Sequence, residues 1–399
     1  MAPILSICIP TYNRSGYLYF TLKSIVEQKI FQETNDIEVV ISDNCSSDLT
    51  ERISKIFADK YPTKIKYNRN KENIGDYNFE HVLSLGTGEV LKLHNDNFSI
   101  LDGALDEIVD LIKNFREEKP TIFFANGNSP LNKDSMCKDL NEFLTAASYL
   151  TTWIAACSFW REDFEKREDF ARNVHTNLSQ TDMVFDMSAS GKPFYVYNKN
   201  VFEGLGVLKK GGYNISKIFG KNYLSFLKVH MANGKLDKKV YENEKKRLLL
   251  NHIIPMRFSS SRREKGWVFV NDGFWRHLIP DYWYNPYFYF SIFKILRLML
   301  DAELNLIGRK LNKNAYQKYW RKRNRHNDTT IAKEVDVTKV YVGKNVQGKI
   351  SADFSENPRE ILIIDDNVIL KENSHFNFEE DEFILILAGE DLSKQSVCN

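Results

Sequence analysis

Asp96 is the carboxylate whose position in the sequence most favours a role as a ligand in a functional site. It lies in the stretch Val90–Phe98, which begins with apolar residues after Gly88 and then carries the polar triplet Asn95–Asp96–Asn97. This pattern is typical of a buried parallel strand that delivers a side chain to the carboxyl edge of a sheet. A lone carboxylate at a strand end also forms turns and caps helices, so its position alone does not establish a ligand.

Two earlier apolar runs also end in polar loops. Ile4–Pro10 precedes the loop Thr11–Arg14, and Ile37–Ser42 precedes the loop Asp43–Asp48. A shorter strand is expected at Ile65–Tyr67, and apolar spacing predicts helices at Tyr17–Ile30, Leu49–Ala58 and Tyr77–Leu85. Strands that alternate with helices form right-handed crossovers and a parallel sheet, so we expect these loops to meet at one edge.

The remaining elements divide the chain into three predicted domains, residues 1–205, 206–327 and 334–399. The first continues with helices at Ala104–Phe115 and Gln180–Ala189, strands at Pro120–Ala125 and Pro193–Tyr197, a polar and mobile loop at Asn126–Lys138, and a candidate pocket wall at Trp153–Trp160. The second is helical over 214–251 and aromatic over Tyr282–Phe290, with a helix at Ile292–Ile307. The third contains short strand-like runs, at Val335–Val340, Ile361–Ile364, Val368–Leu370 and Phe383–Leu387, which predict a small β module.

Composition excludes several classes of protein. The formal net charge of +2 argues against a dedicated nucleic-acid binder, and five cysteines without a CxxC pair provide no zinc site and fit a reducing compartment. Residues Met1–Pro10 lack the basic region of a signal peptide, and no window approaches the roughly 20 apolar residues of a membrane span. We therefore expect a cytoplasmic protein that can contact a membrane only at its surface.

The polar loops resemble the motifs of the family 2 inverting glycosyltransferases. The matching pieces, in chain order, are Ile7–Arg14, Ile41–Asp48, Asn73–Gly75 with Asn78, and Asn95–Asn97 followed by Gly103–Leu105. Each motif is weak alone, but four in this order on strand ends are specific, and the likeness is strongest to bacterial O-antigen and capsule sugar transferases, including the abequosyltransferase-like group. The resemblance implies an α/β domain of the GT-A fold, which is Rossmann-like, with a mostly parallel sheet and flanking helices.

The resemblance also implies residue roles toward a nucleoside diphosphate sugar, with UDP favoured. Asp43 would accept a hydrogen bond from the base or ribose, because a carboxylate at a strand end reads an N–H or hydroxyl donor well. Tyr12 would pack on the base, while Pro10 and Thr11 would shape the floor of the pocket. The other matched positions assigned to nucleotide binding are Arg14, Asn73, Gly75, Asn78 and Asn95. In the alternative interpretation, Asp43 and Asp48 only form an Asx turn and cap the next helix.

Asn95–Asp96–Asn97 stands where such enzymes carry an acidic DxD-type motif. A divalent cation held by a carboxylate neutralises the charge of a diphosphate leaving group. Asp96 is therefore the expected ligand of Mg²⁺ or Mn²⁺, assisted by Asn97, while His94 is more readily explained as a core or loop residue. Because only one carboxylate remains, we expect cation binding to depend on the nucleotide.

An inverting transferase needs a general base to take the proton of the acceptor hydroxyl. The resemblance places it at the start of a helix that ends in Gly191 and precedes an apolar strand, where the customary position falls on Gln180 and Asp182 lies two residues later. We favour Asp182, with Asp186 and His175 as weaker candidates. Alternatively, Asp182 is only an acidic residue favoured by the helix dipole.

The stretch Arg309–Arg325 carries eight Lys and Arg residues and no acidic residue. It is either a solvated face or, together with the aromatic residues from Tyr282, a membrane-surface element spanning 282–325. Nucleic-acid binding is the least favoured alternative.

Together these patterns predict an inverting glycosyltransferase that transfers a sugar to a glycan or lipid-linked acceptor in bacterial surface polysaccharide biosynthesis. The β module is expected to support self-association. A catalytically inactive nucleotide-sugar-binding scaffold is the alternative, and a nucleotidyltransferase is disfavoured because Pro10–Arg14 contains no glycine-rich phosphate loop.

Overall fold

The computed structural model describes residues 2–167, 172–205, 209–261, 266–293, 295–297, 339–340, 361–364 and 386–387. The chain forms two compact units. The first comprises Met1–Gly204, Gly211–Glu264 and Val268–Lys310, and the second comprises Leu205–Lys210, Lys265–Trp267 and Leu311–Asn399. Each unit is described by itself below, and the predicted domain boundaries stay predictions.

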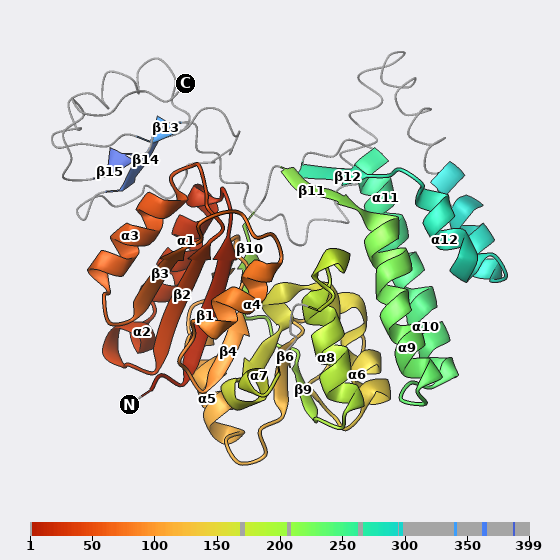
Figure 1. Ribbon diagram of the computed structural model, residues 1–399, viewed down its shortest axis with the longest axis horizontal. Helices are drawn as coiled ribbons and strands as arrows, with labels where there is room; N and C mark the ends of the chain where they lie inside the picture. Colours follow the sequence, from red (N-terminus) through yellow and green to blue (C-terminus); the bar gives the residue numbers. More distant parts are fainter. Residues whose placement is uncertain are drawn as a thin grey trace, which may run out of the picture. The chain divides into compact units, whose positions relative to one another are not determined.

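The first unit is built on a five-stranded sheet with the order β3-β2-β1-β4-β8 (Figure 1). Its strands are β1 (Leu5–Thr11), β2 (Ile37–Asp43), β3 (Ile65–Arg69), β4 (Val90–Leu93) and β8 (Ser158–Trp160). The first four are mutually parallel and β8 is antiparallel to β4. Every residue of β1, β2 and β4 is buried, because helices cover both faces of the sheet, and this explains their nearly continuous apolar sequences.

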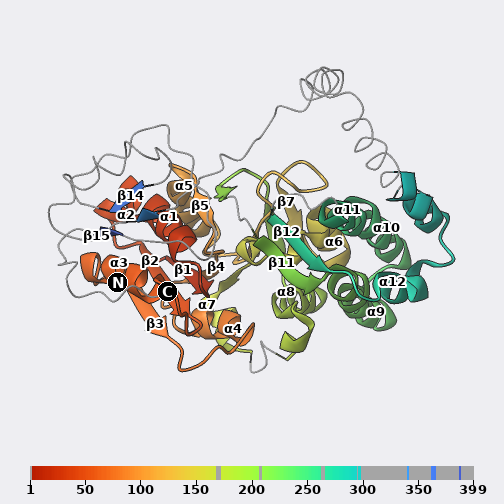
Figure 2. The same ribbon diagram turned by 90° about the horizontal axis from the view of Figure 1, so that it is seen from above.

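The direction of winding reverses between β1 and β4. The chain runs outward from β1 to β2 and β3, and then returns to place β4 on the other side of β1. Right-handed crossovers therefore place α4 (Tyr77–Ser84) on one face of the sheet, opposite α1 (Ser15–Val26), α2 (Lys29–Glu33) and α5 (Ala104–Asn114), as Figure 2 shows. Helix α3 (Thr50–Lys60) packs against α1. Ligands of such sheets bind at the carboxyl ends of the strands at this switch point.

The strand predicted at the start of Val90–Phe98, ending in the polar triplet Asn95–Asn97, is confirmed as β4, and Phe98 begins a separate strand. β4 ends at Leu93, the residues His94–Asn97 form a turn, and β5 (Phe98–Ile100) pairs antiparallel with β10 (Phe202–Gly204). The polar triplet interrupts the apolar run, and the turn places Asp96 beyond the end of the parallel strand.

A second sheet, β6-β9-β7, adjoins the first through β8. It comprises β6 (Thr121–Phe124), β9 (Phe194–Tyr197) and β7 (Ser135–Cys137). An isolated bridge joins Phe123 to Cys157, and the Trp160 indole donates to the Pro120 carbonyl at 2.8 Å. The prediction that Asn126–Lys138 is only a loop was wrong at its end, because β7 pairs antiparallel with β9.

Helices pack around the second sheet and continue into the C-terminal part of this unit. Those near the sheet are α6 (Leu140–Ala147), the 3-10 turns η1 (Ser148–Thr152), η2 (Ile154–Ala156) and η3 (Val174–Thr176), α7 (Arg161–Glu165) and α8 (Ser179–Ala189). The helical pattern predicted over 214–251 is confirmed, with π-helical segments at η4 (Ser216–Tyr223) and η5 (Leu249–Ile253) beside α9 (Leu224–Ala232), α10 (Lys238–Leu248) and α11 (Ile254–Ser261). β11 (Lys209–Asn214) pairs with β12 (Gly266–Val270), and α12 (Phe274–Tyr282) follows.

The helix predicted from Ile292 begins earlier, since residues 286–293 and 295–297 are helical. In the second unit, β13 (Lys339–Val340), β14 (Ile361–Ile364) and β15 (Ile386–Leu387) form a parallel sheet, which confirms three of the predicted strand-like runs. Val368–Leu370 and the basic stretch Arg309–Arg325 lie outside the described residues. Among the helices that the structure describes, none is long and apolar enough to cross a membrane.

Helix α10 is joined to η1 through the buried carboxyl of Glu244. This group accepts hydrogen bonds from the Ser148 hydroxyl at 2.7 Å and the Tyr223 hydroxyl at 2.8 Å. Burial raises the pKa of Glu244 to about 7, although the two hydroxyls and Arg247 oppose this shift. Burial therefore favours the protonated carboxyl.

Glu244 is expected to make the stability of the protein depend on pH. Its folded-state pKa lies above the ordinary value of 4.5, so the stability it contributes is complete below about pH 4.5 and is lost as the pH rises through about 7. In Glu244→Gln, which stays neutral, the free energy of unfolding should fall less between pH 5 and pH 8. Urea denaturation at both pH values measures this, with exposed Glu117→Gln as the control. An unchanged pH dependence in Glu244→Gln would refute the assignment.

Candidate functional site

Asp96 lies at the switch point and is held there by β1 and α1. Its carboxylate Oδ2 accepts a hydrogen bond from the Thr11 hydroxyl at 2.9 Å, and its carbonyl accepts one from the Thr21 hydroxyl at 2.8 Å. Thr11 is the last residue of β1 and is buried, whereas Asp96 is half-buried. The predicted floor residue and the predicted cation ligand are therefore in direct contact.

The surroundings of Asp96 suit a cation. Burial raises the pKa of its carboxyl, and the charge of Asp48 acts in the same direction, although Arg14 and the Thr11 hydrogen bond oppose both. A positive charge brought to Asp96 would favour its ionised form. The Oδ1 atom of neighbouring Asn95 is buried and has no hydrogen-bond partner, so it is an unused oxygen of the kind that hard cations prefer as ligands.

The protein's own ligand set at this position is small. The described part of the chain contains no group of three or more His, Cys, Asp or Glu side chains able to hold a metal ion. Asn97, which follows Asp96 in the sequence, is buried. These residues fit a cation that takes most of its ligands from a diphosphate and water.

His94 and Lys92 are buried beneath this loop. The His94 Nε2 lies 2.9 Å from the Phe98 carbonyl, which can only accept, so Nε2 carries the proton. Burial first and the Lys92 charge second lower the pKa of His94 to about 3, so the ring is neutral. The Lys92 ammonium donates to the carbonyls of Leu93 and Ala155, and burial lowers its pKa to about 7. These contacts support a structural role for His94.

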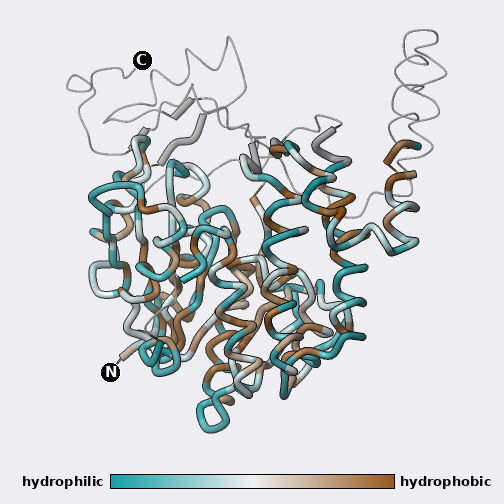
Figure 3. The backbone as a smooth tube through the Cα atoms, turned by 45° about the vertical axis from the view of Figure 1, so that its right-hand side comes forward, coloured by the Kyte–Doolittle hydropathy of each residue, from teal (hydrophilic) through white to brown (hydrophobic). Residues whose placement is uncertain are grey.

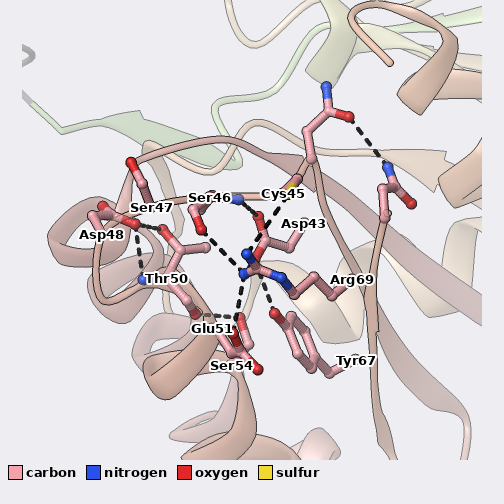
Figure 4. Close-up of polar contacts among 12 residues, drawn as sticks. Asp43, Cys45, Ser46, Ser47, Asp48, Thr50, Glu51, Ser54, Tyr67 and Arg69 are labelled. Carbon is pink, nitrogen blue, oxygen red and sulfur yellow. Dashed lines mark hydrogen bonds and ion pairs between the residues drawn. The ribbon is translucent and has the colours of Figure 1, made fainter. Parts of the chain in front are cut away.

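Asp43, predicted to bind the base or ribose, is fully buried and has several partners within the protein (Figure 4). Its Oδ1 accepts from the Ser46 backbone N–H at 2.9 Å, and its Oδ2 accepts from the Tyr67 hydroxyl at 2.9 Å. The guanidinium of Arg69 lies 3.7 Å from the same Oδ2 and also contacts Glu51 at 3.0 Å. Tyr67 and Arg69 were not identified from the sequence, where a Tyr and an Arg in strand β3 give no such signal.

The loop after β3 is tied to the end of β2 by asparagines. The Asn78 side chain donates to the Ser42 carbonyl at 2.8 Å and accepts from the Ser42 hydroxyl at 2.6 Å and from Asn70 at 3.0 Å. Asn44 accepts from the Ile74 N–H at 2.9 Å. Asn73, an exposed residue, accepts from the Gly75 N–H at 2.9 Å.

Gly75 has a φ of +59°, in the left-handed region that favours glycine, and its carbonyl accepts from Asn44 at 3.1 Å. Asn78 therefore supports the loop, while Asn73 and Gly75 are exposed on it.

The loop after β1 is likewise joined to the loop after β2. The Asn13 backbone N–H donates to the Ser46 hydroxyl at 2.9 Å, and the Arg14 N–H donates to the Thr50 hydroxyl at 3.1 Å. Pro10 is buried, whereas Tyr12 is 45% exposed and free to stack on a planar ligand. The structure thus brings the loops after β1, β2, β3 and β4 together at one edge.

Asp182 and Gln180 lie in the first turn of α8. The Asp182 Oδ2 accepts from the Arg172 Nε at 2.6 Å and from the Asn173 amide at 2.9 Å. Arg172 also pairs with Asp186 at 3.4 Å, and although burial raises the Asp186 pKa, Arg172 and Arg167 lower it below its usual value. His175 is exposed.

Gln180 donates to the Thr152 carbonyl at 3.0 Å, and its buried Oε1 has no hydrogen-bond partner. The segment before α8 also reaches the nucleotide loops, because Asn177 donates to the Asp76 carboxylate at 3.0 Å. The predicted base and the predicted nucleotide-binding residues therefore lie on neighbouring segments.

Two aromatic residues of the predicted pocket wall behave differently. Trp153 is half-buried and packs on Phe98, with ring centroids 5.1 Å apart, whereas Trp160 is buried in the core. A cavity of about 490 Å³ lies elsewhere, where Met136 and Cys137 of β7, Asn141 and Thr145 of α6, and Val240 of α10 line it.

Comparison with known proteins defines the class of this domain. Residues 6–175 match the family model described as Glycosyl transferase family 2, so this part of the chain is a glycosyltransferase family 2 domain. The match and the mostly parallel sheet confirm the predicted GT-A fold class, and the match supports the predicted enzyme class, a glycosyltransferase. The roles of individual residues stay predictions.

Curated relatives are similar over part of the chain. Abequosyltransferase RfbV of Salmonella typhimurium is 39% identical over 123 residues, which are 29% of this chain and 36% of the relative. The GalNAc(5)-diNAcBac-PP-undecaprenol beta-1,3-glucosyltransferase of Campylobacter jejuni is 32% identical over 109 residues, covering 27% of this chain and 34% of the relative. The chain thus spans about a third of the length of these relatives.

Solved structures are similar at lower sequence identity. Mannosyltransferase PcManGT from Pyrobaculum calidifontis, in complex with GDP-Man and Mn²⁺, gives a TM-score of 0.46 at 18% identity, covering 77% of this chain and 88% of that chain. S. aureus TarS 1–349 in complex with UDP-GlcNAc gives a TM-score of 0.47 at 14% identity, covering 70% of this chain and 79% of that chain.

Asn78→Ala is expected to lower the free energy of unfolding by about 2–3 kcal/mol, because it removes three buried hydrogen bonds and leaves the Ser42 carbonyl without this donor. Chemical denaturation measures the change, with exposed Asn114→Ala as the control. Equal stability of the two variants would contradict a supporting role for Asn78.

Proposed function

We propose that the protein transfers a sugar from a nucleoside diphosphate donor, with UDP as the favoured nucleotide, to an acceptor hydroxyl with inversion at the anomeric carbon. The observation that carries this proposal is the Thr11–Asp96 hydrogen bond at the switch point of a glycosyltransferase family 2 domain. Around it, Tyr12 and Asn73 are exposed and Arg14 is half-buried, so their side chains can reach a nucleotide. Because Asp43 is buried, it would bind the base or ribose either indirectly, through Tyr67 and Arg69, or directly after a local rearrangement.

Asp96 would hold a divalent cation, Mn²⁺ or Mg²⁺, with the amide oxygens of Asn95 and Asn97 beside it. When bound, the cation offsets the negative charge of the diphosphate leaving group. Arg14 already contributes positive charge at Asp96. Because the protein supplies one carboxylate here, we expect cation and nucleotide to bind together.

Asp182 is the proposed general base. The acceptor oxygen attacks the anomeric carbon, the bond from that carbon to the diphosphate breaks, and the hydroxyl proton passes to the Asp182 carboxylate. Arg172 and Asn173 both contact Oδ2, so these two hydrogen bonds would orient the carboxylate while Oδ1 faces the acceptor. Gln180 is an amide and has no basic atom for this proton, so we assign it to positioning the acceptor.

For the acceptor, we propose a glycan or lipid-linked glycan of a bacterial surface polysaccharide, elongated at the cytoplasmic side of the membrane. Support comes from the similarity to an abequosyltransferase and to an enzyme whose name includes PP-undecaprenol. Self-association through residues 334–399 stays a prediction.

Asp96→Ala is expected to abolish stabilisation by nucleotide with Mn²⁺. A ligand that binds the folded protein at 100 times its Kd stabilises it by about 2.7 kcal/mol, which raises the melting temperature. A thermal-shift panel of nucleoside diphosphates, each with and without Mn²⁺, measures this, with exposed Asp110→Ala in α5 as the control. The wild type should respond most to UDP with Mn²⁺. If no nucleotide stabilises the wild type, the transferase proposal fails.

Asp182→Asn is expected to reduce the release of UDP from UDP-sugars by about 10²–10⁴-fold while leaving the nucleotide-induced thermal shift unchanged. Asp186→Asn also removes an Arg172 partner, so it separates loss of the base from loss of the ion pair. Equal loss in both variants would contradict Asp182 as the base. Nucleotide binding without any turnover in the wild type would instead indicate a scaffold.

A further inference from the structure

The helical residues 286–293 and 295–297 and the preceding α12 expose an apolar face, here called the outer face. Phe290 is 73% exposed, Phe293 66%, Leu296 59% and Trp283 59%. The outer face also includes the exposed side chains of Trp275, Ile279, Tyr284 and Tyr289. Figure 3 shows brown, hydrophobic segments in this helix where it meets the grey trace.

The spacing of these residues shows that the exposure is a property of a whole helix face. Positions 290, 293 and 296 lie on one stripe at intervals of three residues, and position 289 lies four residues before 293 on the same side. The opposite stripe is buried and includes Phe288, Ser291 and Ile295. A helix that covers a protein core presents a polar opposite side, whereas this one is apolar on both sides, which marks an interaction surface.

The outer face is held firmly by the body of the first unit. The Tyr282 hydroxyl donates to the Lys245 carbonyl at 3.0 Å, and the buried Lys245 ammonium donates to the Tyr284 hydroxyl at 2.8 Å. Lys228 pairs with Asp281, and the rings of Tyr282 and Phe288 stack with centroids 6.1 Å apart. The exposed aromatic residues are therefore displayed on an anchored element.

The charge of the surrounding sequence bears on the kind of partner that the outer face fits. No acidic residue occurs between Asp281 and Asp301, an interval that includes Lys294 and Arg297. The sequence that follows carries eight Lys and Arg residues between Arg309 and Arg325, again without an acidic one. Trp, Tyr and Phe side chains combined with cations match the interface of a membrane with anionic lipids.

We propose that the outer face docks on an anionic membrane surface, with Phe290, Phe293 and Leu296 inserted among the lipid head groups. The contact would hold the enzyme beside a lipid-linked acceptor, but it requires neither donor binding nor catalysis. It depends on apolar burial for affinity and on cations for selectivity toward anionic lipid.

The test is co-sedimentation of the full-length protein with phosphatidylcholine vesicles that contain or lack phosphatidylglycerol, an anionic lipid. The triple substitution Phe290→Ser, Phe293→Ser and Leu296→Ser should weaken binding to the anionic vesicles at least tenfold. A matched control replaces the exposed apolar residues Leu131 and Val229 with Ser and should bind like the wild type. Binding of the wild type should decrease at high salt, and Trp fluorescence should shift to the blue on binding.

Each contrary outcome is decisive. Absence of wild-type binding to anionic vesicles, or equal binding by the triple variant, would overturn the proposal. A dimer in solution that the triple substitution dissociates, without vesicle binding, would assign the outer face to a second copy of the chain. The UDP-induced thermal shift of the same samples shows whether the donor site and fold are intact, so failure here is distinguishable from failure of the proposed function.

Discussion

The reversal of winding between β1 and β4 is the constraint on which the site depends. The connections of these two parallel strands leave toward opposite sides of the sheet. No crossover therefore passes above the carboxyl ends of the two strands. Thr11 and Asp96 occupy these ends, and their hydrogen bond joins the first strand of the domain to the fourth. Burial raises the pKa of the Asp96 carboxyl, whereas the charge of Arg14 opposes this rise. A bound cation would likewise favour the ionised carboxylate.

Around this point, buried side chains hold the loops in place, and exposed side chains are available to a ligand. Asp43, Asn44, Asn70 and Asn78 are buried and hydrogen-bonded, and they join the loops after β2 and β3. Tyr12, Asn73 and Gly75 are exposed on those loops. Buried amides and carboxylates are costly unless they are fully paired, so these networks specify one arrangement of the loops.

Much of the fold was predictable because β1, β2, β3 and β4 are apolar runs bounded by polar loops, and their order predicts the crossovers. The end of β4 in the polar triplet was predicted, but β5 was not, because the short run from Phe98 gives no signal of its pairing with β10. Lys92 was unexpected as well, since a lysine in the run VLKL gives no indication that its ammonium will be buried among carbonyls and aromatic rings.

The candidate site was predictable in its location but not in its internal pairing. The partners of Asp43, Tyr67 and Arg69, come from the neighbouring strand and follow from the register of β2 with β3. Arg172, the partner of Asp182, precedes α8 in an irregular segment, and only the folded chain shows this ion pair. Motifs therefore identify the residues, whereas their electrostatic state depends on tertiary neighbours.

The most direct measurement is hydrogen exchange of the full-length chain with and without UDP and Mn²⁺. The account predicts slower exchange in the four strand-end loops, at residues 11–14, 43–48, 73–78 and 95–97, with α5 unchanged. Protection confined to residues 131–145, around the cavity of about 490 Å³, or no protection at all, would contradict a single nucleotide site at the β1–β4 switch point.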